Sequence, residues 1–188
     1  MKICHKMQEV ITHLAAKHGL DLAQPEARLR LDMPGFDRLV IERTGQKLVS
    51  VAHYYEQHSR LMPDPEIVFF IGDSGWIPLE ITQILGGQRV YAVLSPDGQE
   101  VALINAVDQA SLALFAEDWA HNIETQGWLE DAEKWDPCDP SKAQAPDLET
   151  LIEWEAEGGC EAVDGCWVES DGTCTHGCPS WLLVMGLI

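Results

Sequence analysis

Short apolar segments separated by turn residues fill residues 27–94, and their spacing is the strongest constraint on the fold. Glycine, proline and aspartate occupy the breaks, which is the composition of tight turns. Because no break is long enough for a crossover helix, consecutive strands must run in opposite directions. The pattern predicts an antiparallel sheet of about five to six strands, formed by residues 27–31, 36–43, 47–55, 66–71, 76–85 and 89–94.

Two helices are expected to flank this sheet. Apolar residues recur at helical spacing over residues 6–18, and Gly19 supplies a C-terminal stop. A longer helix is predicted from about Asp108 to Gln126, with Gly127 after its end. The fold class is therefore α+β, in the order N-terminal helix, antiparallel sheet and long helix.

The chain changes character after residue 130. Residues 1–130 form the predicted main domain, and residues 131–147 contain three prolines and few apolar side chains, which indicates a linker or a long surface loop. Residues 148–188 are predicted to hold a short helix followed by a small cysteine-rich module, in which Asp147 caps the helix.

The cysteine-rich module carries the clearest chemical signal. Four of the six cysteines lie close together as C-x5-C-x7-C-x3-C, and Asp171-Gly172 predicts a hairpin turn between the inner two. Four converging thiolates suit tetrahedral zinc, and a module this small needs a metal to fold. The predicted structural zinc ligands are Cys160, Cys166, Cys174 and Cys178.

Several alternatives remain open for this module. His176 replaces Cys178 as the fourth ligand in one of them, and disulfides or unliganded thiols replace the metal in others. Four protein ligands would close the site, so catalysis is not expected there. Cys4 and Cys138 are interpreted as incidental, because Cys4 is near the terminus and carboxylates surround Cys138.

The charge is strongly asymmetric. The formal net charge is −19, and residues 61–188 hold only three Lys/Arg against 24 Asp/Glu. Such a field repels nucleic acids and anionic membranes and attracts basic proteins. The alternative interpretation is that the acidic residues contribute only to solubility. The predicted partner-binding carboxylates, among which tryptophans are interleaved, are Glu130, Asp131, Glu133, Asp136, Asp139, Glu149, Glu153 and Glu157.

Two alternative functions attach to the main domain. The run "HYYEQH" offers a possible ligand contact or catalytic site, although its histidines are five apart rather than the four of H-E-x-x-H. Its candidate residues are His53, Tyr55, Glu56 and His58, with Tyr54 as the alternative to Tyr55. A zinc-stabilised nucleic-acid binder would instead use Arg28, Arg30, Arg38, Arg43 and Lys47.

The N-terminus lacks the apolar core of a signal peptide, and no segment is apolar enough to span a bilayer. We therefore expect a cytoplasmic protein with reduced thiols.

The runs "VAHYYEQHSRLMPDPEIVF" (51–69) and "FAEDWAHNIETQGW" (115–128) resemble an uncharacterised bacterial domain found on plasmids and integrative conjugative elements, domain of unknown function 6908. The resemblance covers about residues 6–130 and implies a small α+β domain carried by mobile DNA, with no established activity. The cysteine-rich end is similar to tails of other proteins from these elements. With the acidic charge, this predicts a non-enzymatic accessory protein that binds a basic host protein, for example the nucleic-acid-binding groove of a defence complex, as an anti-CRISPR-like mimic would.

Overall fold

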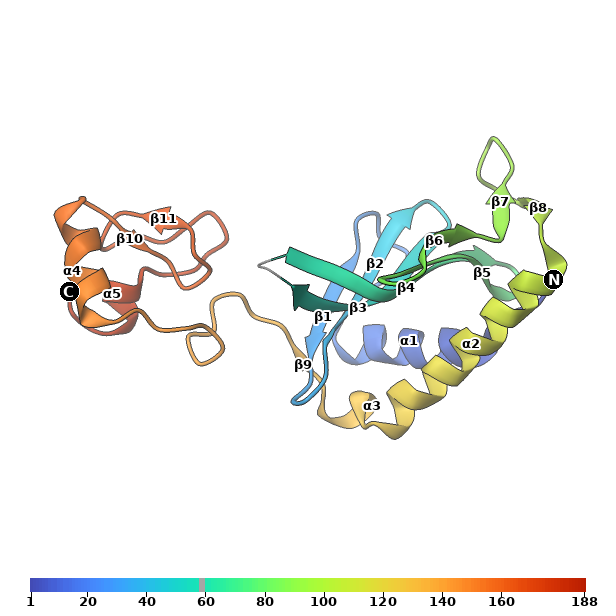
Figure 1. The fold of residues 1–188 in the computed structure, drawn as a ribbon, viewed down its shortest axis with the longest axis horizontal. Coiled ribbons are helices and arrows are strands. Elements are labelled where there is room, and N and C mark those ends of the chain that lie inside the picture. Colours follow the sequence, from blue (N-terminus) through green and yellow to red (C-terminus); the bar gives the residue numbers. More distant parts are fainter. Residues whose placement is uncertain (58–59) are drawn as a thin grey trace. The chain divides into compact units, whose positions relative to one another are not determined.

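An antiparallel sheet organises the first part of the chain, as the turn spacing predicts. The structure is a computed structural model that describes residues 1–57 and 60–188, and all of their side chains except those of residues 56–57, 60–61 and 103. The chain divides into two units, Met1–Trp135 and Asp136–Ile188 (Figure 1).

The sheet of the first unit has seven strands in the order β6-β5-β4-β3-β2-β1-β9, each antiparallel to its neighbours. Two further strands pair separately as a hairpin. The strands are β1 (Arg28–Asp32), β2 (Arg38–Gly45), β3 (Leu48–Gln57), β4 (Arg60–Gly72), β5 (Gly75–Gln83), β6 (Gly87–Val90), β7 (Ala92–Leu94), β8 (Val101–Ile104) and β9 (Glu133–Lys134).

Among its described residues the first unit has nine strands rather than the expected five to six, for three reasons. The segment predicted at 89–94 divides, because β6 pairs with β5 whereas β7 pairs with β8. The second of these partners, β8, lies in residues where no strand was predicted. In addition, β9 comes from residues interpreted as linker and pairs with β1, with Leu31 opposite Lys134. A two-residue strand has no periodicity, so local sequence carries no signal for it.

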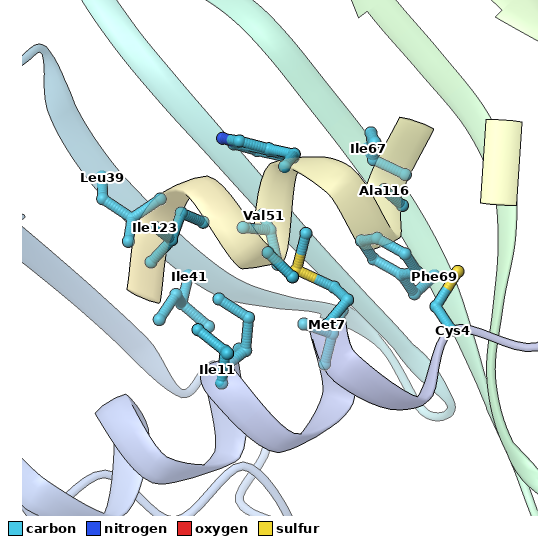
Figure 2. Close-up of a cluster of buried hydrophobic side chains, with 14 of the residues drawn as sticks. Cys4, Met7, Ile11, Leu39, Ile41, Val51, Ile67, Phe69, Ala116 and Ile123 are labelled. Atoms are coloured by element: carbon cyan, nitrogen blue, oxygen red, sulfur yellow. The ribbon is translucent and has the colours of Figure 1, made fainter. Parts of the chain in front are cut away.

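Helices cover one face of this sheet (Figure 1). They are α1 (His5–Lys17), α2 (Ala106–Thr125) and the short α3 (Trp128–Asp131). Met7 and Ile11 of α1 and Ile123 of α2 pack against alternate strand residues in one core (Figure 2). The fully buried Gln109 of α2 fixes the N-terminal segment, because its side chain bonds both the N–H and the carbonyl of Lys2, at 2.9 and 2.7 Å.

The second unit has little regular structure. Its elements are α4 (Leu148–Ala156), β10 (Cys160–Glu161), β11 (Trp167–Val168) and α5 (Trp181–Val184). A turn occurs at Gly172, as expected, but β10 pairs with β11 upstream of it, so the hairpin does not join Cys166 to Cys174. Across the part of the chain that the structure describes, every helix is too short or too polar to traverse a bilayer.

Candidate metal centre

Two loops of the second unit have the same backbone pattern and build the site between them. In the first, the Ala162 N–H bonds the Cys166 carbonyl at 2.7 Å, and in the second, the Cys174 N–H bonds the Cys178 carbonyl at 2.9 Å. The fourth residue of each loop is a glycine with φ near +85°, Gly165 at +83° and Gly177 at +88°. Only glycine adopts this conformation without strain, so each glycine turns the chain sharply beside a potential ligand.

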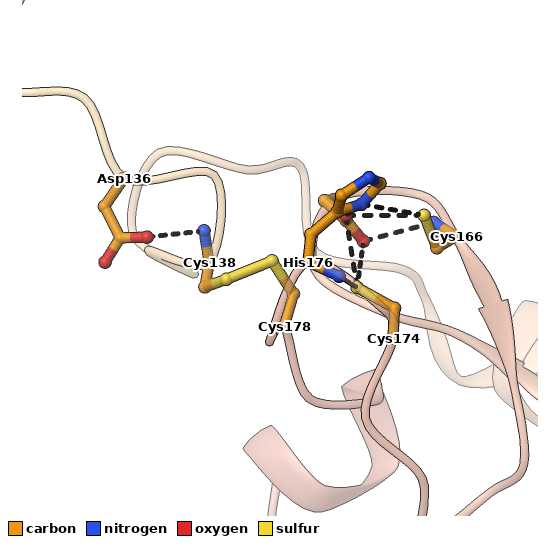
Figure 3. Close-up of a disulfide and its surroundings, with 7 residues drawn as sticks. Asp136, Cys138, Cys166, Cys174, His176 and Cys178 are labelled. Carbon is orange, nitrogen blue, oxygen red and sulfur yellow. Dashed lines mark hydrogen bonds and ion pairs between the residues drawn. A yellow bond between two sulfur atoms is a disulfide. The ribbon is translucent and has the colours of Figure 1, made fainter. Parts of the chain in front are cut away.

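The two loops bring four ligand atoms together, from Asp164, Cys166, Cys174 and His176 (Figure 3). All four atoms lie within 4.8 Å of one another. The Asp164 carboxylate is central, since its Oδ2 lies 2.7 Å from His176 Nδ1 and 3.4 and 3.3 Å from the Cys166 and Cys174 sulfurs. Cys166 Sγ also lies 3.4 Å from His176 Nδ1.

Three of these separations, at 3.3–3.4 Å, match a tetrahedral metal site, whereas the 2.7 Å between Asp164 Oδ2 and His176 Nδ1 is a hydrogen-bond distance that a bound metal would lengthen. A zinc–sulfur distance of about 2.3 Å and a zinc–nitrogen or zinc–oxygen distance of about 2.0–2.1 Å place neighbouring ligands roughly 3.3–3.8 Å apart. Backbone donors orient two of the ligands: the Cys166 N–H donates to Asp164 Oδ1 at 3.2 Å, and the His176 N–H donates to Cys174 Sγ at 3.3 Å. The four residues therefore form a group that could hold a metal ion.

Hydrogen bonds within the site favour an ionised Asp164 carboxylate and a protonated Cys166 thiol. Burial alone would raise the pKa of Asp164, but hydrogen bonds from His176, from the Cys166 backbone and from two thiols lower it. The hydrogen bond from Cys166 to Asp164, followed by burial and the carboxylate charge, raises the pKa of Cys166 to about 11. The protons that the thiols donate to this carboxylate are those that a bound cation would replace.

The structure brings together part of the predicted zinc set. Cys166 and Cys174 lie in the site, and so does His176, which the sequence offered as an alternate ligand. Cys178 instead forms a disulfide with Cys138, 40 residues away in the sequence (Figure 3). The thiol of Cys160 is buried and donates to the Glu161 carbonyl at 3.2 Å.

Two further residues differ from the interpretation of the sequence. Cys138 is not incidental, because its disulfide with Cys178 ties the proline-rich segment to the second glycine-containing loop; the expectation of reduced thiols is therefore wrong for these two cysteines. Asp164 was missed, although a repeated motif marks it: Asp164-Gly165-Cys166 and His176-Gly177-Cys178 share the form [D/H]-G-C twelve residues apart. In the sequence alone, nothing else distinguished Asp164 from the many exposed carboxylates around it.

His53, the candidate in the sheet, is used in packing. Its ring lies 5.5 Å from Trp119 and 5.2 Å from Trp128, and Nδ1 bonds the Asp37 carbonyl at 2.8 Å. Burial lowers the pKa of His53, against the opposing effect of the Asp37 carbonyl. Tyr55 is half-buried on β3, whereas the Glu56 side chain and His58 lie outside the described residues.

The predicted nucleic-acid-binding cations are held within the first unit. Trp135 lies against two of them, with the Arg30 and Arg38 guanidinium groups 4.7 and 4.4 Å from its ring centre. Arg38 also bonds Asp32 at 2.8 Å, and Arg28 pairs with Glu42 at 3.4 Å. The remaining two bond backbone carbonyls: Arg43 that of Gln46, and Lys47 that of Gln99.

The predicted partner-binding carboxylates are divided between the units. Glu130, Asp131 and Glu133 are exposed in the first unit. The second unit exposes Asp136, Glu149, Glu153 and Glu157, whereas Asp139 is half-buried and accepts a hydrogen bond from Ser141.

Comparison with known proteins assigns a family to the first unit but not to the second. Residues 8–129 match the model of a family described as Domain of unknown function (DUF6908), and this match ends before the cysteine-rich unit begins. No curated protein and no solved structure matches the chain.

Proposed function

This chain belongs to the DUF6908 family through residues 8–129, and from that premise we propose that it is a non-enzymatic acidic protein that binds a basic protein surface. The sequence resemblance extends the proposal to an accessory protein of a mobile genetic element in the cytoplasm. A nucleic-acid-binding defence complex is a partner of the right charge, because a surface that binds phosphates also attracts carboxylates.

The exposed carboxylates of the second unit carry this proposal. Asp136–Ile188 contains eleven Asp/Glu and one Lys/Arg, and four of the acids, Glu149, Glu153, Glu155 and Glu157, project from one helix and its end. Among the described residues these four glutamates form no ion pair with Lys or Arg. Their charge is therefore available to a partner rather than neutralised within the unit.

Zinc is the metal that the donor set fits best, and we assign it a structural role. Two thiolates and an imidazole favour zinc over magnesium or calcium, and the Asp164 oxygen completes a set of four. When bound, zinc would crosslink the two glycine-containing loops and stabilise the unit against unfolding. Four protein donors complete tetrahedral coordination, which is the arrangement of structural rather than catalytic sites.

The packing of His53 favours this proposal over an enzyme in the sheet domain. A general base must reach a substrate proton, whereas His53 lies between two tryptophans and bonds a backbone carbonyl. The intramolecular partners of Arg28, Arg30 and Arg38 likewise argue against a nucleic-acid binder.

Affinity capture with the full chain tests the proposed function. The zinc-loaded protein should retain one or more proteins rich in Lys/Arg from a lysate of its host, identified by mass spectrometry. Retention should weaken steeply as salt rises, and a variant with Glu149, Glu153 and Glu157 changed to Gln should retain less at every salt concentration. Retention that is insensitive to both salt and these substitutions would rule out the proposal.

A further inference from the structure

The exposed side of α4 combines apolar and acidic residues in a way that charge alone does not explain. We propose that this exposed side of α4 binds a basic amphipathic helix of the partner. The inference rests on the proposed function. We call this surface the α4 face. It consists of Leu148, Ile152 and Ala156, flanked by Glu149, Glu153 and Glu155.

Helix geometry separates the two sides of α4. Residues four apart lie on the same side of a helix, so Leu148, Ile152 and Ala156 form one line. Leu151, which is only 4% exposed, and the half-buried Trp154 lie beside this line, about 60° and 120° around the helix from Leu148, and both pack into the core of the unit. The α4 face is thus a second apolar line, which adjoins the packed residues and is left exposed.

The exposure of this second line is large for its residue types. Leu148 is 68% exposed and Ile152 is 59% exposed. Adjacent exposed aliphatic residues with a charged border have the composition of a protein-binding surface. The helix itself is well fixed, because the Asp147 carboxylate accepts the Thr150 N–H at 2.9 Å and the Trp154 ring meets that of Trp167 edge-on at 6.2 Å.

The charges beside the line determine which occupant fits. At about 100° per residue, Glu155 lies on one side of the line, and Glu149 and Glu153 lie on the other. A helix with leucine-type residues on one side and Lys/Arg along both borders would bury Leu148 and Ile152 and pair with these glutamates. A second copy of this chain would oppose glutamates with glutamates, and a nucleic acid would oppose them with phosphates, so both are disfavoured.

Binding of synthetic helical peptides by the zinc-loaded full chain tests the inference. One peptide carries leucines on one side and lysines along the borders, and the second replaces the leucines with alanine. The double variant Leu148→Ser/Ile152→Ser should bind the leucine peptide at least about tenfold more weakly and the alanine peptide unchanged. A matched control, Val107→Ser/Leu114→Ser, removes exposed aliphatic residues from α2 and should bind both peptides as the parent does.

The outcomes separate this inference from the proposed function. If Glu149→Gln/Glu153→Gln abolishes binding but Leu148→Ser/Ile152→Ser does not, the surface is purely electrostatic; the inference then fails and the proposed function stands. A dimer in analytical ultracentrifugation that the serine variant dissociates would show that a second copy covers the face, which also overturns the inference. Failure of the captured partner itself to bind the parent protein at low salt would remove both. Unchanged zinc content and circular dichroism must show that each variant is folded.

Discussion

The two units of this chain are stabilised in different ways. In Met1–Trp135, a cluster of 23 buried residues joins three helices to a seven-stranded sheet. The corresponding cluster of Asp136–Ile188 has seven buried residues, two of which are cysteines. Burial of apolar surface suffices for the first unit, whereas the second needs crosslinks to offset the entropy of ordering its loops.

The two units also differ in which structural features they hold in place. The large core fixes a rigid domain that a family model recognises along residues 8–129. The small unit fixes two glycine-containing loops and two short helices, and leaves most of its carboxylates exposed. Its structure therefore depends on its cysteines, through a disulfide and a proposed metal site. Substitution of these cysteines is the most direct test of the difference between the units.

Removal of the proposed zinc ligands should have the largest effect. In Cys166→Ser/Cys174→Ser, the second unit should lose zinc and unfold, because metal binding in small zinc modules supplies about 10 kcal/mol or more of folding free energy. Hydrogen exchange should show lost amide protection in α4 and β10 and unchanged protection in β2 and β3. Metal content is measured by mass spectrometry of the purified protein.

Two matched single variants identify the ligand set. Asp164→Asn should weaken zinc binding by about tenfold or more, since it replaces a carboxylate ligand by a neutral amide. Cys160→Ala should keep one zinc per chain, because the Cys160 sulfur lies outside the four-atom group. The opposite pattern, in which Cys160→Ala loses zinc and Asp164→Asn keeps it, would restore the all-cysteine set that the spacing predicts.

The contrast between the units also explains how far the sequence could predict this structure. The helices and most strands follow from local signals, namely apolar periodicity and turn residues, and those signals are dense in residues 6–126. Two of the features that were missed are nonlocal: β9 pairs with β1 across about a hundred residues, and Cys138 meets Cys178 across a separation of 40. Asp164 became a candidate ligand only when the loop pairing placed it beside two sulfurs.

A cavity in the core of the first unit should have the next largest effect. Phe69 is fully buried and packs against Trp76 with ring centres 5.6 Å apart. Phe69→Ala should lower the free energy of unfolding of this unit by about 3–5 kcal/mol, whereas Leu114→Ala, at a position 55% exposed, should change it by less than about 0.5 kcal/mol. Urea unfolding measures both. Zinc content should stay the same, and loss of zinc from the Phe69→Ala protein would show that the units are not independently stable.

Reduction of the disulfide should weaken the second unit by less than metal removal. A crosslink that closes a loop of this length contributes about 2–4 kcal/mol by restricting the unfolded chain. The double variant Cys138→Ala/Cys178→Ala should therefore remain folded with zinc bound, but with lower amide protection in α4. Complete unfolding of this variant in zinc would mean that the disulfide, rather than the metal, is the main crosslink.

Protonation of His53 should give the smallest effect. Burial lowers the pKa of His53 below its ordinary value of 6.5, so the unfolded chain binds this proton more readily than the folded chain. Stability of the first unit is therefore full above pH 6.5 and falls as the pH drops toward the folded-state pKa, by at most about 1.4 kcal/mol per pH unit. His53→Phe keeps a ring beside Trp119 and Trp128 but cannot titrate, so its stability should depend less on pH in this range. Hydrogen exchange of amides in β2 and β3 at several pH values, corrected for intrinsic exchange, measures the stability of the first unit in both proteins. If stability depends equally on pH in the parent and in His53→Phe, His53 is not the titrating group.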